Sequence, residues 1–162
     1  MALIQLQNVD ARIASLAVVY HLGRPGSEID PETMQEHRAS LEPVQAAIRG
    51  QLDNAVITLD LQPWQVQRLG QAIQGASNEL RQYGISEGRS VVPGFSEVVG
   101  EYWPETVDDP SAASDLVQHA VMLRRRLDAV ISEAEAEMAA TQAAAEAERQ
   151  ARRGSWWQVW KR

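Results

Sequence analysis

Residues 111–153, SAASDLVQHAVMLRRRLDAVISEAEAEMAATQAAAEAERQARR, contain neither glycine nor proline. A stretch of this length without a helix breaker predicts one long helix of about 65 Å, at 1.5 Å per residue. Asp109 and Pro110 stand directly before it. An N-capping carboxylate followed by proline is favoured at the start of a helix. Residues 109–153 therefore predict a capped, uninterrupted C-terminal helix.

The two halves of the long helix differ in how much apolar surface they offer. In the first half, apolar residues alternate at four- and three-residue spacing, the pattern of a helix packed in a bundle: Leu116, Ala120, Leu123, Leu127, Val130 and Ala134. Beyond that point alanine and glutamate dominate, and they favour helix while giving little to bury. We expect residues 1–134 to form the bundle and residues 135–153 to continue as a solvated helical extension.

Three shorter helices are predicted before the long one. Residues 8–22 carry apolar side chains at helical spacing. A second helix is expected over residues 31–54, because Asp30 supplies an N-cap and a proline occupies the first helical position. Pro43 lies inside this second helix, so we expect a kink or a restart there. The third helix is expected over residues 63–83.

One short stretch has the alternating pattern of extended chain. Residues 54–64, NAVITLDLQPW, alternate apolar and polar side chains. No partner strand is evident, and a single strand is not stable by itself, so we expect an extended connector. Gly70 and Gly75 fall inside the helix that follows. Close packing against a neighbouring helix would explain why glycines occur there.

The composition favours helices over a sheet-based core. The chain has 162 residues, the size of one domain, and only one phenylalanine, so its core depends on leucine, isoleucine, valine and alanine. The predicted fold is therefore all-α: a bundle of about four helices with a long C-terminal helix projecting from it.

Residues 84–110 form the least regular part of the predicted bundle. This connection holds four glycines and three prolines, with one short helix expected near residues 95–102. We expect Phe95, Tyr102 and Trp103 to plug the open end of the bundle. The alternative is an enzyme site whose acid and base groups would be carboxylates of the same connection: Glu97, Glu101, Glu105 or Asp108.

Few residues point to catalysis or to a bound cofactor. The chain lacks cysteine, which excludes disulfides and thiolate-bound metals. His21, His37 and His119 fall on different predicted helices, and Asp115 with His119 would supply only half of a metal site. No glycine-rich segment has the spacing of a phosphate-binding loop. We expect no metal and no cofactor, and we lean against an enzyme.

Charge argues against nucleic acid as a partner. The net charge is −7, whereas phosphate binding needs a dense basic face. Arg124, Arg125 and Arg126 form the densest basic cluster, but successive helical residues are about 100° apart and cannot form one patch. We interpret them as a solvated helix face; contact with phosphates or with an acidic partner is the alternative.

The last nine residues, GSWWQVWKR at 154–162, hold three of the five tryptophans. Gly154 would end the long helix and Ser155 would cap a new turn. Aromatic and arginine side chains are typical anchors of protein interfaces. The predicted partner-binding residues are Arg152, Arg153, Trp156, Trp157, Val159, Trp160, Lys161 and Arg162.

Three docking partners are compatible with this tail. They are another protein or a second subunit, the chain's own bundle, and an anionic membrane surface bound weakly. A stiff extension would be unnecessary for a tail that folds back, so we favour the first. The functional hypothesis is a non-catalytic helical assembly or adaptor protein, oligomeric through helix or tail contacts. No apolar run is long enough to span a membrane, and we expect a cytoplasmic location.

Overall fold

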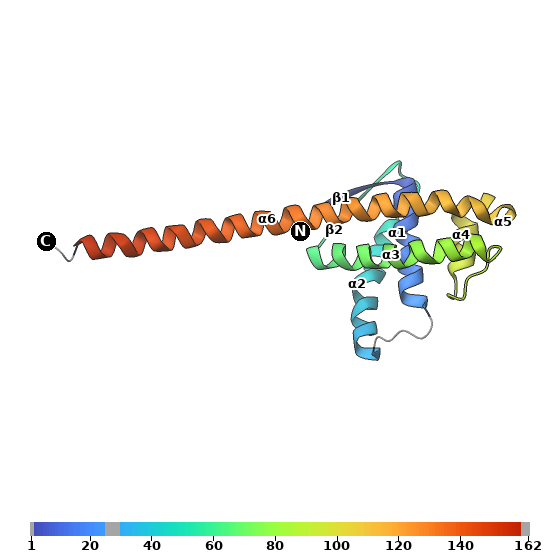
Figure 1. Cartoon of the computed structure of the whole chain (residues 1–162), viewed down its shortest axis with the longest axis horizontal. Helices are drawn as coiled ribbons and strands as arrows, with labels where there is room; N and C mark the ends of the chain where they lie inside the picture. The colour runs from blue at the N-terminus through green and yellow to red at the C-terminus, as the bar shows by residue number, and fades with distance from the viewer. Residues whose placement is uncertain (1, 25–29, 160–162) are drawn as a thin grey trace.

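The computed structural model describes residues 2–24 and 30–159, and for residues 151–159 it describes the backbone alone. The described elements are β1 (Ala2–Gln7), α1 (Asn8–Gly23), α2 (Pro31–Arg49), β2 (Val56–Leu61), α3 (Pro63–Ile85), α4 (Phe95–Tyr102), α5 (Glu105–Asp108), the 3-10 turn η1 (Pro110–Ala112) and α6 (Ala113–Val159). They form a helical bundle from which α6 projects far to one side (Figure 1). The predicted all-α fold with a projecting last helix is confirmed.

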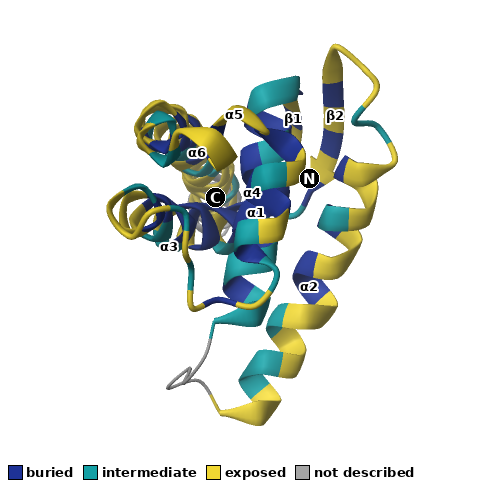
Figure 2. Cartoon of the chain, turned by 90° about the vertical axis from the view of Figure 1, so that its right-hand side faces the viewer, coloured by how far each residue is buried: buried dark blue, intermediate teal, exposed yellow. Residues whose placement is uncertain are grey.

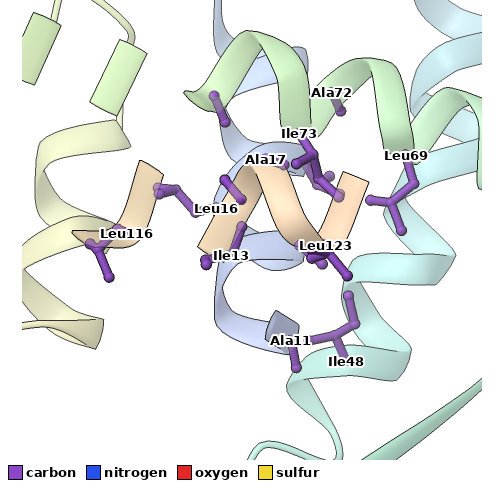
Figure 3. Packing of buried hydrophobic residues seen from close by; sticks show 14 of the residues in the cluster. Ala11, Ile13, Leu16, Ala17, Ile48, Leu69, Ala72, Ile73, Leu116 and Leu123 are labelled. Atoms are coloured by element: carbon purple, nitrogen blue, oxygen red, sulfur yellow. The ribbon is translucent and has the colours of Figure 1, made fainter. Parts of the chain in front are cut away.

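Helix α1 is the centre of the bundle. Helices α2, α3, α4 and α6 all pack against it, and Figure 2 shows it enclosed by them. Its buried residues lie all around its surface, as expected for a helix at the centre of a core: Ala11, Ile13, Ala14, Leu16, Ala17 and Val18. Figure 3 shows this core where α1 meets Ile73 of α3 and Leu123 of α6.

Helix α2 begins where the sequence predicts. The Thr33 backbone N–H donates to Asp30 Oδ1 at 2.9 Å, and the Thr33 hydroxyl donates to the other carboxylate oxygen at 2.7 Å. The helix continues through Pro43, which lies inside it on an exposed position. The predicted restart is therefore wrong. Pro43 cannot donate a hydrogen bond to the Ala39 carbonyl oxygen, but both residues are exposed, so water can bond to that oxygen instead.

The stretch predicted as a connector is a paired strand. β2 pairs with β1 in antiparallel register, with Ala2 opposite Leu61 and Gln7 opposite Val56. The alternating side chains of both strands that turn towards the core are buried: Ile4, Leu6, Ile57, Leu59 and Leu61. Five aligned apolar side chains and the shared backbone hydrogen bonds supply the stability that one strand alone would lack.

The connection between α3 and α6 closes one end of the bundle, as predicted. Phe95 is completely buried, and Tyr102 and Trp103 are 7% and 6% exposed. The Tyr102 hydroxyl lies 3.1 Å from the Ser15 hydroxyl, and Arg12 donates to the Tyr102 carbonyl oxygen at 2.8 Å. These contacts tie α4 to the middle of α1, so the aromatic residues are part of the core.

Helix α6 has 47 residues and runs through Gly154 to Val159. The predicted helix end at Gly154 and new cap at Ser155 are therefore wrong. A glycine costs a helix about 1 kcal/mol relative to alanine, which is too little to end it where no packed element redirects the chain. At the other end, Asp109 accepts a hydrogen bond from the Ser111 N–H at 3.1 Å, so it caps η1 directly before α6.

Candidate functional site

The projecting part of α6, residues 132–159, is called the arm here. Residues 132–150 are exposed except for two partly buried alanines, Ala134 and Ala145. The last residue of α6 that packs on the core is Ile131. At 1.5 Å per residue, the end of α6 at Val159 lies about 42 Å beyond it. The arm is long enough to hold its end well clear of the bundle, as Figure 1 shows.

The predicted partner-binding residues fall at the far end of the arm. The backbone of Arg152, Arg153, Trp156, Trp157 and Val159 belongs to the last turns of α6, and their side chains lie outside what the structure describes. Trp160, Lys161 and Arg162 are outside the described residues altogether. The predicted site thus has a described backbone position for five of its residues, remote from the bundle.

The three consecutive arginines of α6 have different surroundings. Arg126 turns to the start of α1, where it donates to Asp10 Oδ2 at 2.6 Å and to the Gln5 carbonyl oxygen at 3.0 Å. Since Asp10 is buried, this ion pair fastens α6 to both β1 and α1. Arg124 lies 3.6 Å from Asp128 on its own helix. As predicted, Arg126 does not share a patch with the other two arginines.

Arg124 and Arg125 do share a groove, which the sequence did not indicate. The groove lies between α3 and α6 and has a volume of about 330 Å³. Arg81 of α3 completes its basic lining, beside the polar residues Ser77 and Asn78. A second hollow of about 550 Å³ adjoins it at Arg81, and its lining is mostly apolar, including Leu80, Ile85 and Val117. We call the two together the seam groove, with an arginine half and an apolar half.

Two histidines that the sequence places on separate helices meet in the structure. His21 Nε2 of α1 lies 2.8 Å from His37 Nδ1 of α2, within hydrogen-bonding distance. Burial, and next the positive charge of Arg24, lower the pKa of His21 from 6.5 to about 4. Burial and Arg68 also lower the pKa of His37. Both rings are therefore neutral at pH 7, and the pair links α1 to α2.

The histidine pair predicts a loss of stability in acid. Between pH 6.5 and pH 4 the unfolded chain binds a proton at His21 that the folded chain does not bind, so the free energy of unfolding falls as the pH falls. We expect wild type to lose on the order of 2 kcal/mol more over this range than the His21→Gln variant. Urea unfolding at each pH measures this difference. His119→Gln, at an exposed position, should keep the wild-type slope. Equal slopes in all three proteins would contradict the neutral pair.

The structure also places the residues that were considered for a metal site and for the enzyme alternative. In residues 2–24 and 30–159 no group of three or more His, Asp or Glu side chains is placed to hold a metal ion. The carboxylates of the predicted alternative, Glu97, Glu101, Glu105 and Asp108, are exposed, as is His119. None of these residues lines the seam groove.

Comparison of the chain with models of known families, with curated proteins and with solved structures gave no match. Within the described ranges, none of the helices combines the length and the apolar composition needed to cross a bilayer. The features from which a function can be argued are the helical bundle, the exposed arm and a tail rich in tryptophan and arginine.

Proposed function

We propose that this protein is a non-catalytic adaptor that presents its C-terminal tail, residues 152–162, to a partner protein at the end of the arm. The observation that carries the proposal is the continuity of α6. It is one helix of 47 residues, packed into the bundle at its start and, over residues 132–150, exposed except at two partly buried alanines. Alanine- and glutamate-rich helices act as semi-rigid spacers.

The arm also accounts for the helical backbone of residues 154–159. A helix of about seven residues is not stable in water by itself, because nucleation is too unfavourable. Residues 154–159 continue α6 and need no nucleation of their own. Trp156 and Val159 are three residues apart, which is the spacing of neighbours on one helix face. Tryptophan and arginine are the most frequent anchors of protein interfaces, so such a face would suit an apolar groove on a partner.

Replacing the tail tryptophans tests this proposal. We expect a Trp156→Ala, Trp157→Ala, Trp160→Ala variant to lose at least tenfold in partner recovered by pull-down and mass spectrometry, because indole anchors supply most of such binding energy. Its melting temperature should stay within about 1 °C of wild type, since the arm does not pack on the bundle. Met138→Ala, 52% exposed near the start of the arm, is the matched control and should bind normally.

Two outcomes would contradict the proposal. A large fall in melting temperature would show that the indoles pack on their own bundle. Unchanged recovery of every partner would show that the tail is not the docking element. Co-sedimentation with vesicles of neutral and of anionic lipid tests whether the tail binds a membrane surface instead. Pelleting that requires both the tail and anionic lipid would assign the tail to a membrane surface.

A further inference from the structure

We infer that two copies of this chain pair through α6 in antiparallel orientation, with the arm of each copy lying in the seam groove of the other. This inference is independent of the tail and goes beyond the adaptor function. It depends on the charge, the length and the lining of two surfaces, which are the seam groove between α3 and α6 and the arm of α6.

The arginine half of the seam groove has positive charge without a partner. Among the residues that the structure describes, Arg81 and Arg125 make no ion pair, and Arg124 makes a partly exposed one with Asp128 at 3.6 Å. The groove therefore holds three guanidinium groups against one carboxylate, on a chain whose net charge is −7. Guanidinium groups that converge in this way favour a ligand with several carboxylates.

The arm of a second copy has the complementary charge. Residues 132–148 contain five glutamates and no lysine or arginine. At about 100° per residue, the exposed Glu135 continues the side of α6 that lines the groove at Arg124 and Asp128. The alanines of residues 139–145 come next, and small side chains allow a neighbouring helix to approach closely.

The two surfaces also match in length and direction. Along η1 and α6 the seam groove extends from Ser111 to Asp128, which is about 26 Å of chain. Residues 132–148 span about 24 Å. With the helices antiparallel and residue 132 of one copy opposite residue 128 of the other, Glu135 lies opposite Arg125, and the alanine-rich turns lie along the apolar half. A two-fold axis makes the same contact twice, as in most homodimers.

This pairing would leave the tails accessible. The seam groove ends at Ser111 of η1, whereas the arm continues beyond residue 148 to Val159. The last turns of each arm thus extend past the groove of the other copy. Loss of pairing would not remove the tail, and loss of the tail would not remove the groove, so the two proposals can fail separately.

Charge reversal tests the pairing on the full-length chain. Sedimentation equilibrium or light scattering should give twice the chain mass of 17.9 kDa, about 36 kDa, at micromolar concentrations. The groove variant Arg81→Glu, Arg124→Glu, Arg125→Glu should halve that mass. The arm variant Glu135→Arg should do the same, because each of the two variants brings like charges together.

An equimolar mixture of the groove variant and the arm variant should restore the paired mass, since every contact then joins opposite charges. Arg49→Glu, exposed at the end of α2 away from the groove, is the matched control and should stay paired. Circular dichroism establishes that each variant is folded. A single-chain mass for wild type up to 100 µM, a paired mass in both reversal variants, or no recovery in the mixture would overturn the inference.

Discussion

Replacing Phe95 with alanine should lower the free energy of unfolding by about 3–5 kcal/mol. This side chain is completely buried at the start of α4 and is the only phenylalanine in the chain. Its ring meets that of Tyr20 edge to face, with the centroids 6.2 Å apart. Alanine would leave a cavity between α1 and α4 that the packed helices cannot fill. For a chain of this size the melting temperature should fall by roughly 10 °C.

Val91→Ala is the matched control for this experiment. Val91 belongs to the same connection but is 79% exposed, so its truncation should change the free energy of unfolding by less than about 0.5 kcal/mol. Urea unfolding followed by circular dichroism measures both variants. Comparable small effects would mean that the aromatic residues of this connection do not close the bundle.

Replacing Gly75 with alanine should destabilise the protein by about 1–3 kcal/mol, despite the higher helix propensity of alanine. Helices α1 and α3 approach closely at this glycine. A Cβ atom there would overlap Cε1 of Tyr20 and would lie 3.0 Å from Cδ1 of the same ring. The Tyr20 ring would have to move, and it is held on its other side by Phe95.

Gly70 provides a control of the same type in the same helix. A Cβ atom at Gly70 would meet only Asp128 Oδ1, at an ordinary contact distance of 3.9 Å. Gly70→Ala should therefore stabilise the protein by about 0.5–1 kcal/mol, through helix propensity alone. Thermal melts of the two variants should shift in opposite directions. Shifts of the same sign would contradict the close approach of α1 and α3. The sequence-based explanation of both glycines by close packing thus holds for Gly75 alone.

Local signals in the sequence predicted the helices. Asp30 and the proline after it mark the start of α2, and the absence of glycine and proline over residues 111–153 marks most of α6. The β1–β2 pair could not be predicted with the same means, because it joins segments about 50 residues apart. The central position of α1 also escaped prediction, since a helix buried on all sides has no single apolar stripe.

The candidate functional residues also include some that the sequence indicated and some that only the structure brings together. Composition alone indicated the tail, because tryptophans and basic residues are concentrated there. The seam groove depends on the packing of α3 against α6, which brings Arg81 beside Arg124. The histidine pair depends on the packing of α1 against α2. Neither contact leaves a pattern in the local sequence, so both required the three-dimensional structure.

The arm should hold the tail away from the bundle. A distance measured between two spin labels on α6 tests this most directly. The chain has no cysteine, so Gln118→Cys and Gln158→Cys introduce the only two labelling sites. Labelled protein is diluted tenfold with unlabelled protein, so that only distances within one chain are measured. A helix without interruption predicts a single distribution centred near 60 Å, for 40 residues at 1.5 Å each. A main population below about 40 Å would show that the arm folds back, and would contradict the account.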